Sequence, residues 1–284
     1  MRWNEGRQSD NIEDRRGFPV SRHVAIGGGL GTVALIVIAL FLGVDPSVLL
    51  QSGPQVDVTS PSMTRQAPPV EDPLRDFVAL VLGDTEDTWG DLFQRAGRAY
   101  ERPKLVLFSE AIDSACGFAQ SAVGPFYCQT DHKVYLDLSF FRVMRERLGA
   151  SGDFAQAYVI AHEVGHHVQN LLGIEEKVRA MRQRSSERGA NTLSVRLELQ
   201  ADCLAGVWAY HANRARHVLE AGDIEEGLNA AAAIGDDRLQ KQSRGYVVPD
   251  SFTHGSSAQR VRWFKKGLAN GEMKQCDTFG TERL

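Results

Sequence analysis

His162-Glu163-Val164-Gly165-His166 is the most informative stretch of this 284-residue chain, and it reads H-E-x-x-H. On a helix, residues four apart are rotated by only about 40°, so both imidazoles face the same side. Zn²⁺ favours imidazole nitrogen, and two nitrogens on successive turns can reach one ion. Glu163 lies beside that face, where a carboxylate can take a proton from a water that the metal has made acidic.

The surroundings of the motif predict a helix over Asp153–Leu172. The residues before it, Phe154–Ala161, are mostly apolar and contain neither proline nor glycine. Apolar residues continue after it to Leu172, and Gly173 is a plausible helix stop. The motif is therefore expected in the middle of a helix.

A third protein ligand is expected from a second helix downstream, since catalytic zinc sites have three. Glu198 and Asp202 are four residues apart and share a helical face. We expect Glu198 on the metal, and Asp202 behind it as acceptor for the second N–H of His162 or His166. The alternative is an exposed acidic pair. The apolar residues around them argue against it, because a buried unpaired carboxylate is costly; these are Leu197, Leu199, Leu204, Val207 and Trp208.

The remaining histidines divide into one candidate and several structural residues. His254 lies in a turn of small residues just before a helix that carries Arg260, and either side chain could donate to the oxyanion formed when an amide is hydrolysed. The alternative for His254 is a surface residue near a helix cap. His167 is turned about 100° from His166 and is expected to be structural. His132, His211 and His217 have no partner at metal spacing, and His23 lies at the edge of the apolar segment Val24–Val44.

Val24–Val44 contains 21 residues without a charge, the length of a helix that spans a bilayer. A buried core helix and a cleaved signal peptide are the alternatives; the latter lacks a suitable cleavage site. Five arginines precede this segment and the next cation after it is Arg65. The positive-inside rule then places the N-terminus in the cytoplasm and the rest outside the cytoplasmic membrane, in the periplasm or beyond the cell. The five are Arg2, Arg7, Arg15, Arg16 and Arg22.

Composition predicts four parts: a polar tail (1–23), the anchor (24–44), a linker rich in proline and glycine (45–70) and a folded domain (71–284). A net charge of −4 gives no basic excess for nucleic acid, so no such partner is expected. Four cysteines on the oxidising side allow three pairings or free buried thiols. The pairs Cys116–Cys128 and Cys203–Cys276 are the most economical.

The periodicities predict an α+β domain in which a small sheet precedes a mostly helical part. Strands are expected at Lys104–Phe108, Pro125–Cys128 and Lys133–Leu138. Helices are expected near Asp72, and then at Asp87–Tyr100, Ser139–Leu148, Asp153–Leu172, Thr192–Leu219, Ile224–Leu239 and Ser256–Ala269. The polar stretch Glu175–Ala190, between the two ligand helices, is a candidate mobile loop.

His162-Glu163-x-x-His166 with Glu198-x-x-Ala201-Asp202 resembles the gluzincin pattern, whose downstream glutamate is the third zinc ligand. Membrane-anchored gluzincins of the heat-shock and prenyl-protein-processing type carry a late histidine followed six positions later by arginine, as His254 and Arg260 do here. The chain departs from them at Gly255, where proline is usual.

The whole chain looks like the bacterial neutral zinc metallopeptidases of the YpfJ type. The segments that carry this resemblance are Met1–Trp3 with Ser9–Gly17, the anchor, Gly124–Cys128, His162–Gln169, Glu198–Cys203 and Thr253–Gly255. It implies a zincin-like domain with one Zn²⁺ per chain. In related gluzincins the edge strand before the signature helix binds the peptide substrate, a role that would fall near Lys133–Leu138.

These observations lead to the hypothesis of a membrane-anchored zinc endopeptidase that acts on peptides or proteins. His162, His166 and Glu198 would hold Zn²⁺, Glu163 would be the general base, and His254 or Arg260 would support the oxyanion. Two alternatives stay open. One is a non-catalytic interaction or chaperone-like protein with structural zinc, and the other is a zinc hydrolase acting on a different amide, such as one in the cell wall.

Overall fold

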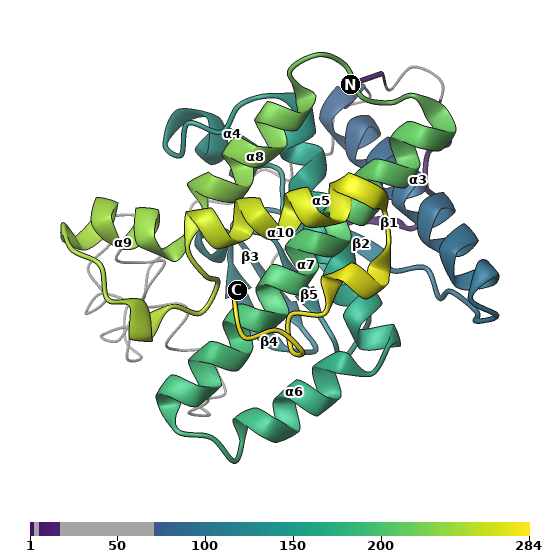
Figure 1. The fold of residues 1–284 in the computed structure, drawn as a ribbon. Helices are drawn as coiled ribbons and strands as arrows, with labels where there is room; N and C mark the ends of the chain where they lie inside the picture. The colour runs from purple at the N-terminus through teal and green to yellow at the C-terminus, as the bar shows by residue number, and fades with distance from the viewer. Residues whose placement is uncertain (3–5, 18–70) are drawn as a thin grey trace, which may run out of the picture.

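The computed structural model describes residues 1–2, 6–17 and 71–284 as an α+β fold (Figure 1). The long helix α3 (Pro73–Arg95) precedes most of a small sheet, and the other described α-helices follow the sheet. The expected span Val24–Val44 and the linker 45–70 lie outside the described residues. Within the described ranges, no helix combines the length and the apolar character needed to cross a bilayer.

The main sheet has the strand order β1-β2-β6-β5. β2 (Lys104–Phe108) runs parallel to β6 (Lys133–Asp137), and β5 (Phe126–Cys128) is antiparallel to β6. Successive side chains of a strand alternate between the two faces. Leu105 and Leu107 accordingly join the core under the helices, whereas Val106 and Phe108 pack with the hairpin formed by β3 (Ala111–Ser114) and β4 (Gly117–Gln120).

β6 is an interior strand, which corrects the expectation that Lys133–Leu138 forms the substrate-binding edge. It pairs with β2 on one side and with β5 on the other, so its backbone groups are already used. The edge of the sheet on this side is β5. Strand order depends on tertiary pairing, and the alternation within Lys133–Leu138 gives no information about it.

The helices form the larger layer (Figure 1). Two of them pack closely at glycines. α7 (Glu187–Arg216) and α10 (Ser257–Asn270) approach backbone to backbone: a Cβ on Gly206 would lie 2.2 Å from Phe264 O, and one on Gly267 would lie 1.9 Å from Cys203 O. Any larger residue would push the two helices apart. The other helices of this part are α4 (Ser139–Glu146), α5 (Asp153–Leu171), α6 (Ile174–Arg182), α8 (Asp223–Ala233) and α9 (Asp236–Arg244), with 3-10 turns η1 (Ser121–Val123), η2 (Pro249–Ser251) and η3 (Met273–Cys276).

Several expected helix bounds were wrong. The two helices expected near Asp72 and over Asp87–Tyr100 are one helix, α3 (Pro73–Arg95), which continues through Gly83, a residue that packs against the backbone of Arg7. The helix expected over Ile224–Leu239 is divided into α8 and α9 at Gly235, where a Cβ would lie 2.4 Å from the backbone of Ser257. α7 begins at Glu187, five residues before the expected Thr192, and Ser186 caps it. Part of the candidate mobile loop is the helix α6.

The N-terminal segment 6–17 is part of the folded domain, which corrects the expectation of a separate polar tail. β1 (Ile12–Asp14) pairs in parallel with β2. The buried carboxylate of Glu86 on α3 accepts hydrogen bonds from Arg7, Ser9 and Asn11 at 2.6–2.7 Å. Without this segment, Glu86 would be a buried charge without these partners, which is costly.

In space, the end of the N-terminal segment lies beside the first residues of the domain that begins at residue 71. Arg16 Nη1 lies 2.6 Å from Asp72 Oδ2, so the two sides of the 18–70 segment are joined by an ion pair. A chain that crossed a membrane once between these residues would place β1 and β2 on opposite sides, where they could not pair. The pairing of β1 with β2 is therefore at odds with the single crossing between these two segments that is expected from the sequence.

Both expected disulfides are confirmed. Cys116 is joined to Cys128, and Cys203 is joined to Cys276. The first ties the loop after β3 to the end of β5. The second ties α7 to η3, so the C-terminal segment is held against the helix that carries Glu198.

Candidate metal centre

Three side chains converge between α5 and α7. His162 Nε2 lies 3.2 Å from Glu198 Oε2, and His166 Nε2 lies 3.5 Å from Glu198 Oε1. One potential ligand atom from each of the three lies within 4.8 Å of the others. Two imidazole nitrogens and a carboxylate oxygen form a donor set that suits Zn²⁺ with one position left for water.

Gly165, inside the signature, allows the two ligand helices to approach each other. A Cβ at this position would lie 3.0 Å from Ala201 O and 3.2 Å from Ala201 Cα. Ala201 lies between Glu198 and Asp202 on α7, so the contact sets the distance between the histidines and the carboxylates. A larger side chain at Gly165 would move Glu198 away from both imidazoles.

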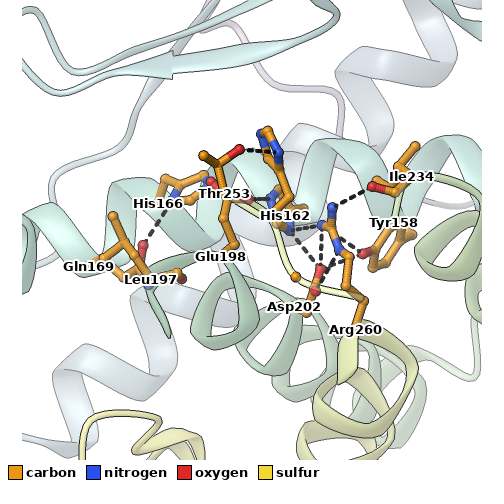
Figure 2. Close-up of polar contacts among 12 residues, drawn as sticks. Tyr158, His162, His166, Gln169, Leu197, Glu198, Asp202, Ile234, Thr253 and Arg260 are labelled. Atoms are coloured by element: carbon orange, nitrogen blue, oxygen red, sulfur yellow. Dashed lines mark hydrogen bonds and ion pairs between the residues drawn. The ribbon is translucent and has the colours of Figure 1, made fainter. Parts of the chain in front are cut away.

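His162 is supported by a buried group of charged and polar residues (Figure 2). Its Nδ1 lies 2.9 Å from Asp202 Oδ1, which satisfies the expectation that Asp202 stands behind a ligand histidine. Tyr158 donates its hydroxyl to the same oxygen. A carboxylate acceptor on Nδ1 fixes the tautomer in which Nε2 has a free lone pair.

Arg260 lies behind His162, beside Asp202 and Tyr158, and its Nη2 is 3.4 Å from His162 Nδ1. Its Nε lies 2.8 Å from Asp202 Oδ2, and its Nη2 lies 2.8 Å from Asp202 Oδ1, so the pair is bidentate (Figure 2). The side chain is 2% exposed. This geometry uses the guanidinium to hold Asp202, in contrast to the oxyanion contact expected from the sequence.

His166 has a different support, which was not predicted from the sequence. Its Nδ1 lies 2.9 Å from Gln169 Oε1, and Gln169 is fully buried (Figure 2). Gln169 is three residues after His166 on the same helix, a spacing that brings side chains together. That spacing was the available signal. A glutamine at such a position is, however, more often an ordinary surface residue.

Glu163 lies beside the ligands and is 7% exposed. Burial raises the pKa of its carboxyl group, and the charges of His162 and His166 oppose that increase. A buried carboxylate with a raised pKa binds a proton more readily, which is the property a general base needs. The structure therefore places Glu163 where the signature requires it.

His254 lies near Glu198, on the turn before α10. A Cβ at the neighbouring Gly255 would lie 3.2 Å from Leu199 Cδ2, so this turn rests on α7 beside the ligand. Gly255 has a φ of +90°, which the proline ring excludes, so the proline usual in the related gluzincins could not take this place. Ser256 caps α10 with a complete capping box.

Asp236 orients His254 and was also missed from the sequence. Its Oδ1 lies 3.2 Å from His254 Nδ1, and its Oδ2 accepts the backbone N–H groups of Thr253, His254 and Gly255. Burial lowers the pKa of His254, but the bond to Asp236 and the charge of Glu198 outweigh it and raise the pKa to about 9. The imidazole is therefore a charged donor at neutral pH.

The charges of the two histidines and of Glu198 shift one another's pKa values. Burial alone would lower the pKa of His166, but the Glu198 carboxylate raises it to about 10. Burial would raise the pKa of Glu198, yet the two histidines hold it well below its usual range. Without a metal, protons on the imidazoles balance the carboxylate. A cation at the same place would replace those protons.

A second group of acidic side chains is close enough to hold a cation: Asp153, Asp223 and Glu226. The N-terminal ammonium of Met1 lies 2.8 Å from Asp153 and 3.4 Å from Asp223. This positive charge offsets part of the negative charge of the group, which contains no nitrogen ligand. Of the two clusters in the described part of the chain, only the histidine cluster has the donors that zinc favours.

The described histidines outside the site have other partners. His167 Nδ1 lies 3.0 Å from Tyr127 Oη, and its Nε2 lies 2.6 Å from Glu101 O, so it joins β5 to α5 as a structural residue. His132 lies 2.9 Å from Glu101, and His211 Nε2 donates to the carbonyl oxygen of Gly271 at 2.9 Å. His217 ends α7 in a left-handed conformation, whereas His23 lies outside the described residues.

Comparison with known proteins gives a match over nearly the whole chain. A family model described as "Putative neutral zinc metallopeptidase" matches residues 1–279. The uncharacterized protein YpfJ of Escherichia coli is 52% identical over 288 aligned positions, covering 99% of both chains. The uncharacterized protein Rv2575 of Mycobacterium tuberculosis is 40% identical over 258 positions, covering 87% of this chain and 86% of its own. No solved structure matches the chain.

Proposed function

The chain belongs to the neutral zinc metallopeptidase family, and on that premise we propose that it is a zinc-dependent endopeptidase. The observation that carries the proposal is the meeting of His162, His166 and Glu198 within 4.8 Å, with Glu163 buried beside them. A purely structural zinc site has no need of a base at that position. The proposal thus rests on the three ligands together with Glu163, because the ligands alone would also fit a structural zinc site.

The residues of the chain divide the work as follows. Zn²⁺, when bound by the three ligands, supplies a Lewis acid that polarises a carbonyl and makes water acidic. Glu163 takes a proton from the attacking water and later gives it to the leaving amine. His254, charged at neutral pH, donates to the oxyanion that develops on the scissile carbonyl.

Two buried carboxylates keep these groups in place. Asp202 holds the tautomer of His162 and is itself held by Arg260. Asp236 holds His254 and the turn around it. Arg260 therefore has a positioning role in this proposal, and His254 is the group that contacts the reacting atoms.

We also propose that the peptide substrate adds a strand beside β5. This strand is an edge of the sheet and lies against α5, with Tyr127 Oη bonded to His167 next to the signature. Strand addition supplies affinity through backbone hydrogen bonds. Backbone N-methylation of a peptide substrate should raise KM at every second position, and an equal effect at all positions would contradict the pairing.

The site of action follows from the disulfides and the N-terminal strand together. Both disulfides favour an oxidising compartment, and we propose that the domain folds there. β1 belongs to the same sheet, so residues 6–17 would lie in the same compartment. Membrane association through Val24–Val44 stays part of the proposal, without the opposite-sides arrangement.

The direct test of the function is Glu163→Gln in the full chain. The amide keeps the shape of the side chain but cannot act as a base, so zinc content should be unchanged and peptide turnover nearly abolished. Gln156→Glu, at a half-buried position two turns earlier on α5, is a matched control that should leave turnover unchanged.

The substrate panel should contain both unstructured peptides and cell-wall fragments. Cleavage of wall fragments alone would favour the alternative that the chain is a zinc hydrolase of a different amide. Full activity of Glu163→Gln would refute the mechanism. If zinc-loaded protein cleaves neither class of substrate, the result would favour the alternative of a non-catalytic interaction protein.

A further inference from the structure

A chain of buried amides leads from His166 to the C-terminal segment. His166 Nδ1 lies 2.9 Å from Gln169 Oε1, and Gln169 Nε2 lies 3.1 Å from Gln200 Oε1. Gln200 Nε2 in turn lies 2.9 Å from the backbone oxygen of Cys276. Gln169 is 0% exposed and Gln200 is 7% exposed, so water has little access to this chain of hydrogen bonds.

The direction of these hydrogen bonds is fixed at their ends. Gln169 Nε2 also lies 2.7 Å from Leu197 O, and carbonyl oxygens such as those of Leu197 and Cys276 can only accept. The NH₂ group of each glutamine must therefore point toward a carbonyl. Each Oε1 is left to face the preceding member, and Gln169 presents an acceptor to His166.

This direction decides which nitrogen of His166 can bind a metal. An acceptor at Nδ1 requires the proton to be on Nδ1, so Nε2 has the free lone pair and faces Glu198. The opposite orientation of Gln169 would put its NH₂ against Nδ1 and favour a proton on Nε2, where it would block zinc. Metal-bound histidines depend on such outer partners for their orientation and basicity.

We propose that Gln169 and Gln200 are positioning residues that select the metal-binding tautomer of His166, and that the Cys203–Cys276 disulfide fixes the far end of this chain. The proposal rests on the proposed zinc site and adds to it a hydrogen-bonded support for His166, whose nearest carboxylate on this side, Glu175, lies 3.8 Å from Nδ1, beyond hydrogen-bond distance. His162 has the charged support of Asp202, whereas the direct acceptor at His166 Nδ1 is a neutral amide.

The far end is held firmly on α7. Cys276, in η3, is bonded covalently to Cys203, the neighbour of Asp202. Two residues later, Thr278 donates its hydroxyl to Arg196 O at 2.7 Å, and it is fully buried. The carbonyl that accepts from Gln200 is thus fixed by a covalent bond and a buried hydrogen bond.

The first experiment measures zinc affinity in the full chain by competition with a fluorescent chelator. Gln169→Met keeps the length of the side chain and removes both the acceptor and the donor. We expect zinc binding about 10–100-fold weaker, the usual effect of losing an outer partner of a ligand. Activity of the zinc-loaded enzyme is not needed for this readout.

Gln240→Met is the matched control. Gln240 is 4% exposed and also bonds through both ends, to Ser251 Oγ at 2.9 Å and to Val248 N at 2.8 Å, but it touches no zinc ligand. Its loss should destabilise the fold to a similar extent and leave zinc affinity unchanged. Equal effects of the two variants on affinity would show that Gln169 acts through stability alone and would overturn the proposal.

A second readout reports on the tautomer. In zinc-loaded protein with ¹⁵N-labelled histidine, the Nδ1 proton of His166 should be protected from exchange with water, and Gln169→Met should remove that protection. Gln200→Met, one step further away, should weaken zinc binding in the same direction by less, and it decides the matter if Gln169→Met does not fold. An unchanged affinity in Gln200→Met would contradict the chain of bonds.

The disulfide arm compares two pairs of cysteines. Cys203→Ala with Cys276→Ala should lower zinc affinity, whereas Cys116→Ala with Cys128→Ala removes the other disulfide and should leave affinity unchanged. Equal affinity in both double variants would overturn the role of the Cys203–Cys276 disulfide. If wild-type protein binds no zinc at all, the proposed function fails; if it binds zinc and Gln169→Met binds as tightly, only this inference fails.

Discussion

Asp202→Asn tests the support of His162 in two separable ways. Asparagine has the same shape as aspartate but no charge, so the fully buried Arg260 loses the carboxylate that it holds at 2.8 Å with two nitrogens. Breaking a buried ion pair by removing one partner costs about 3–5 kcal/mol. For a domain of this size that corresponds to a fall in Tm of roughly 6–20 °C. The loss of the charged acceptor at His162 should also weaken zinc binding about 10–100-fold.

The two effects require two assays on the full chain. Unfolding is followed by urea titration with excess chelator, so that zinc binding does not contribute to the measured stability. Zinc affinity is measured separately by chelator competition. Asp202→Asn with Arg260→Met is the control: it removes the unpaired charge and should regain most of the stability, but not the zinc affinity. A loss below about 1 kcal/mol in Asp202→Asn, or no recovery in the double variant, would refute the argument from burial.

Three other predictions follow from the geometry. Zinc affinity should rise between pH 6 and 8 by about tenfold per pH unit for each proton displaced, because the pKa of His166 in the metal-free site is about 10; a flat profile in chelator competition would contradict this. Asp236→Asn should destabilise metal-free protein more at pH 6 than at pH 9.5 in urea titrations. The pKa of His254 is raised to about 9, so the ion pair with Asp236 contributes its full stability below the ordinary pKa of 6.5 and loses it as pH rises through 9. A larger loss of stability at pH 9.5 would show that His254 is not held as a cation. In the double variant Arg16→Cys with Asp72→Cys, a short bismaleimide should cross-link the two cysteines in intact cells, since the native side chains lie 2.6 Å apart. Labelling of the two cysteines from opposite sides of the membrane would instead support a single membrane crossing between them.

Much of the metal centre could be predicted because it depends on spacing along helices. His162 and His166 share a face of α5, and Glu198 and Asp202 share a face of α7, as residues four apart must. Burial of the second pair followed from the apolar residues around it. The short range of these rules is what makes them reliable in a sequence of unknown fold.

The rest of the site depends on contacts between distant segments. Asp236 reaches His254 from another helix, and nothing local to either residue indicates the pair. The amides of Gln169 and Gln200 become informative only once the carbonyls of Leu197 and Cys276 fix their direction. Arg260 could be found by its spacing from His254, but its role depends on its contacts with Asp202, which lies on another helix.

The fold differed from expectation for the same reason. β1 has three residues, two of them acidic, and lacks the alternation that marks a strand. It forms because β2 offers an edge and because Arg7, Ser9 and Asn11 satisfy Glu86. The N-terminal segment packs against α3 at Gly83, where a Cβ would lie 2.2 Å from Arg7 O. A single sequence shows the glycine but not its neighbour.

The most direct test of the account is the zinc content of the purified full chain, measured by elemental analysis after dialysis beside Glu163→Gln and a variant that lacks both His162 and His166. The account predicts about one zinc per chain in the wild type and in Glu163→Gln, and none in the double histidine variant. Zinc absent from well-folded wild-type protein, or retained without the two histidines, would contradict the central claim that α5 and α7 build a metal centre.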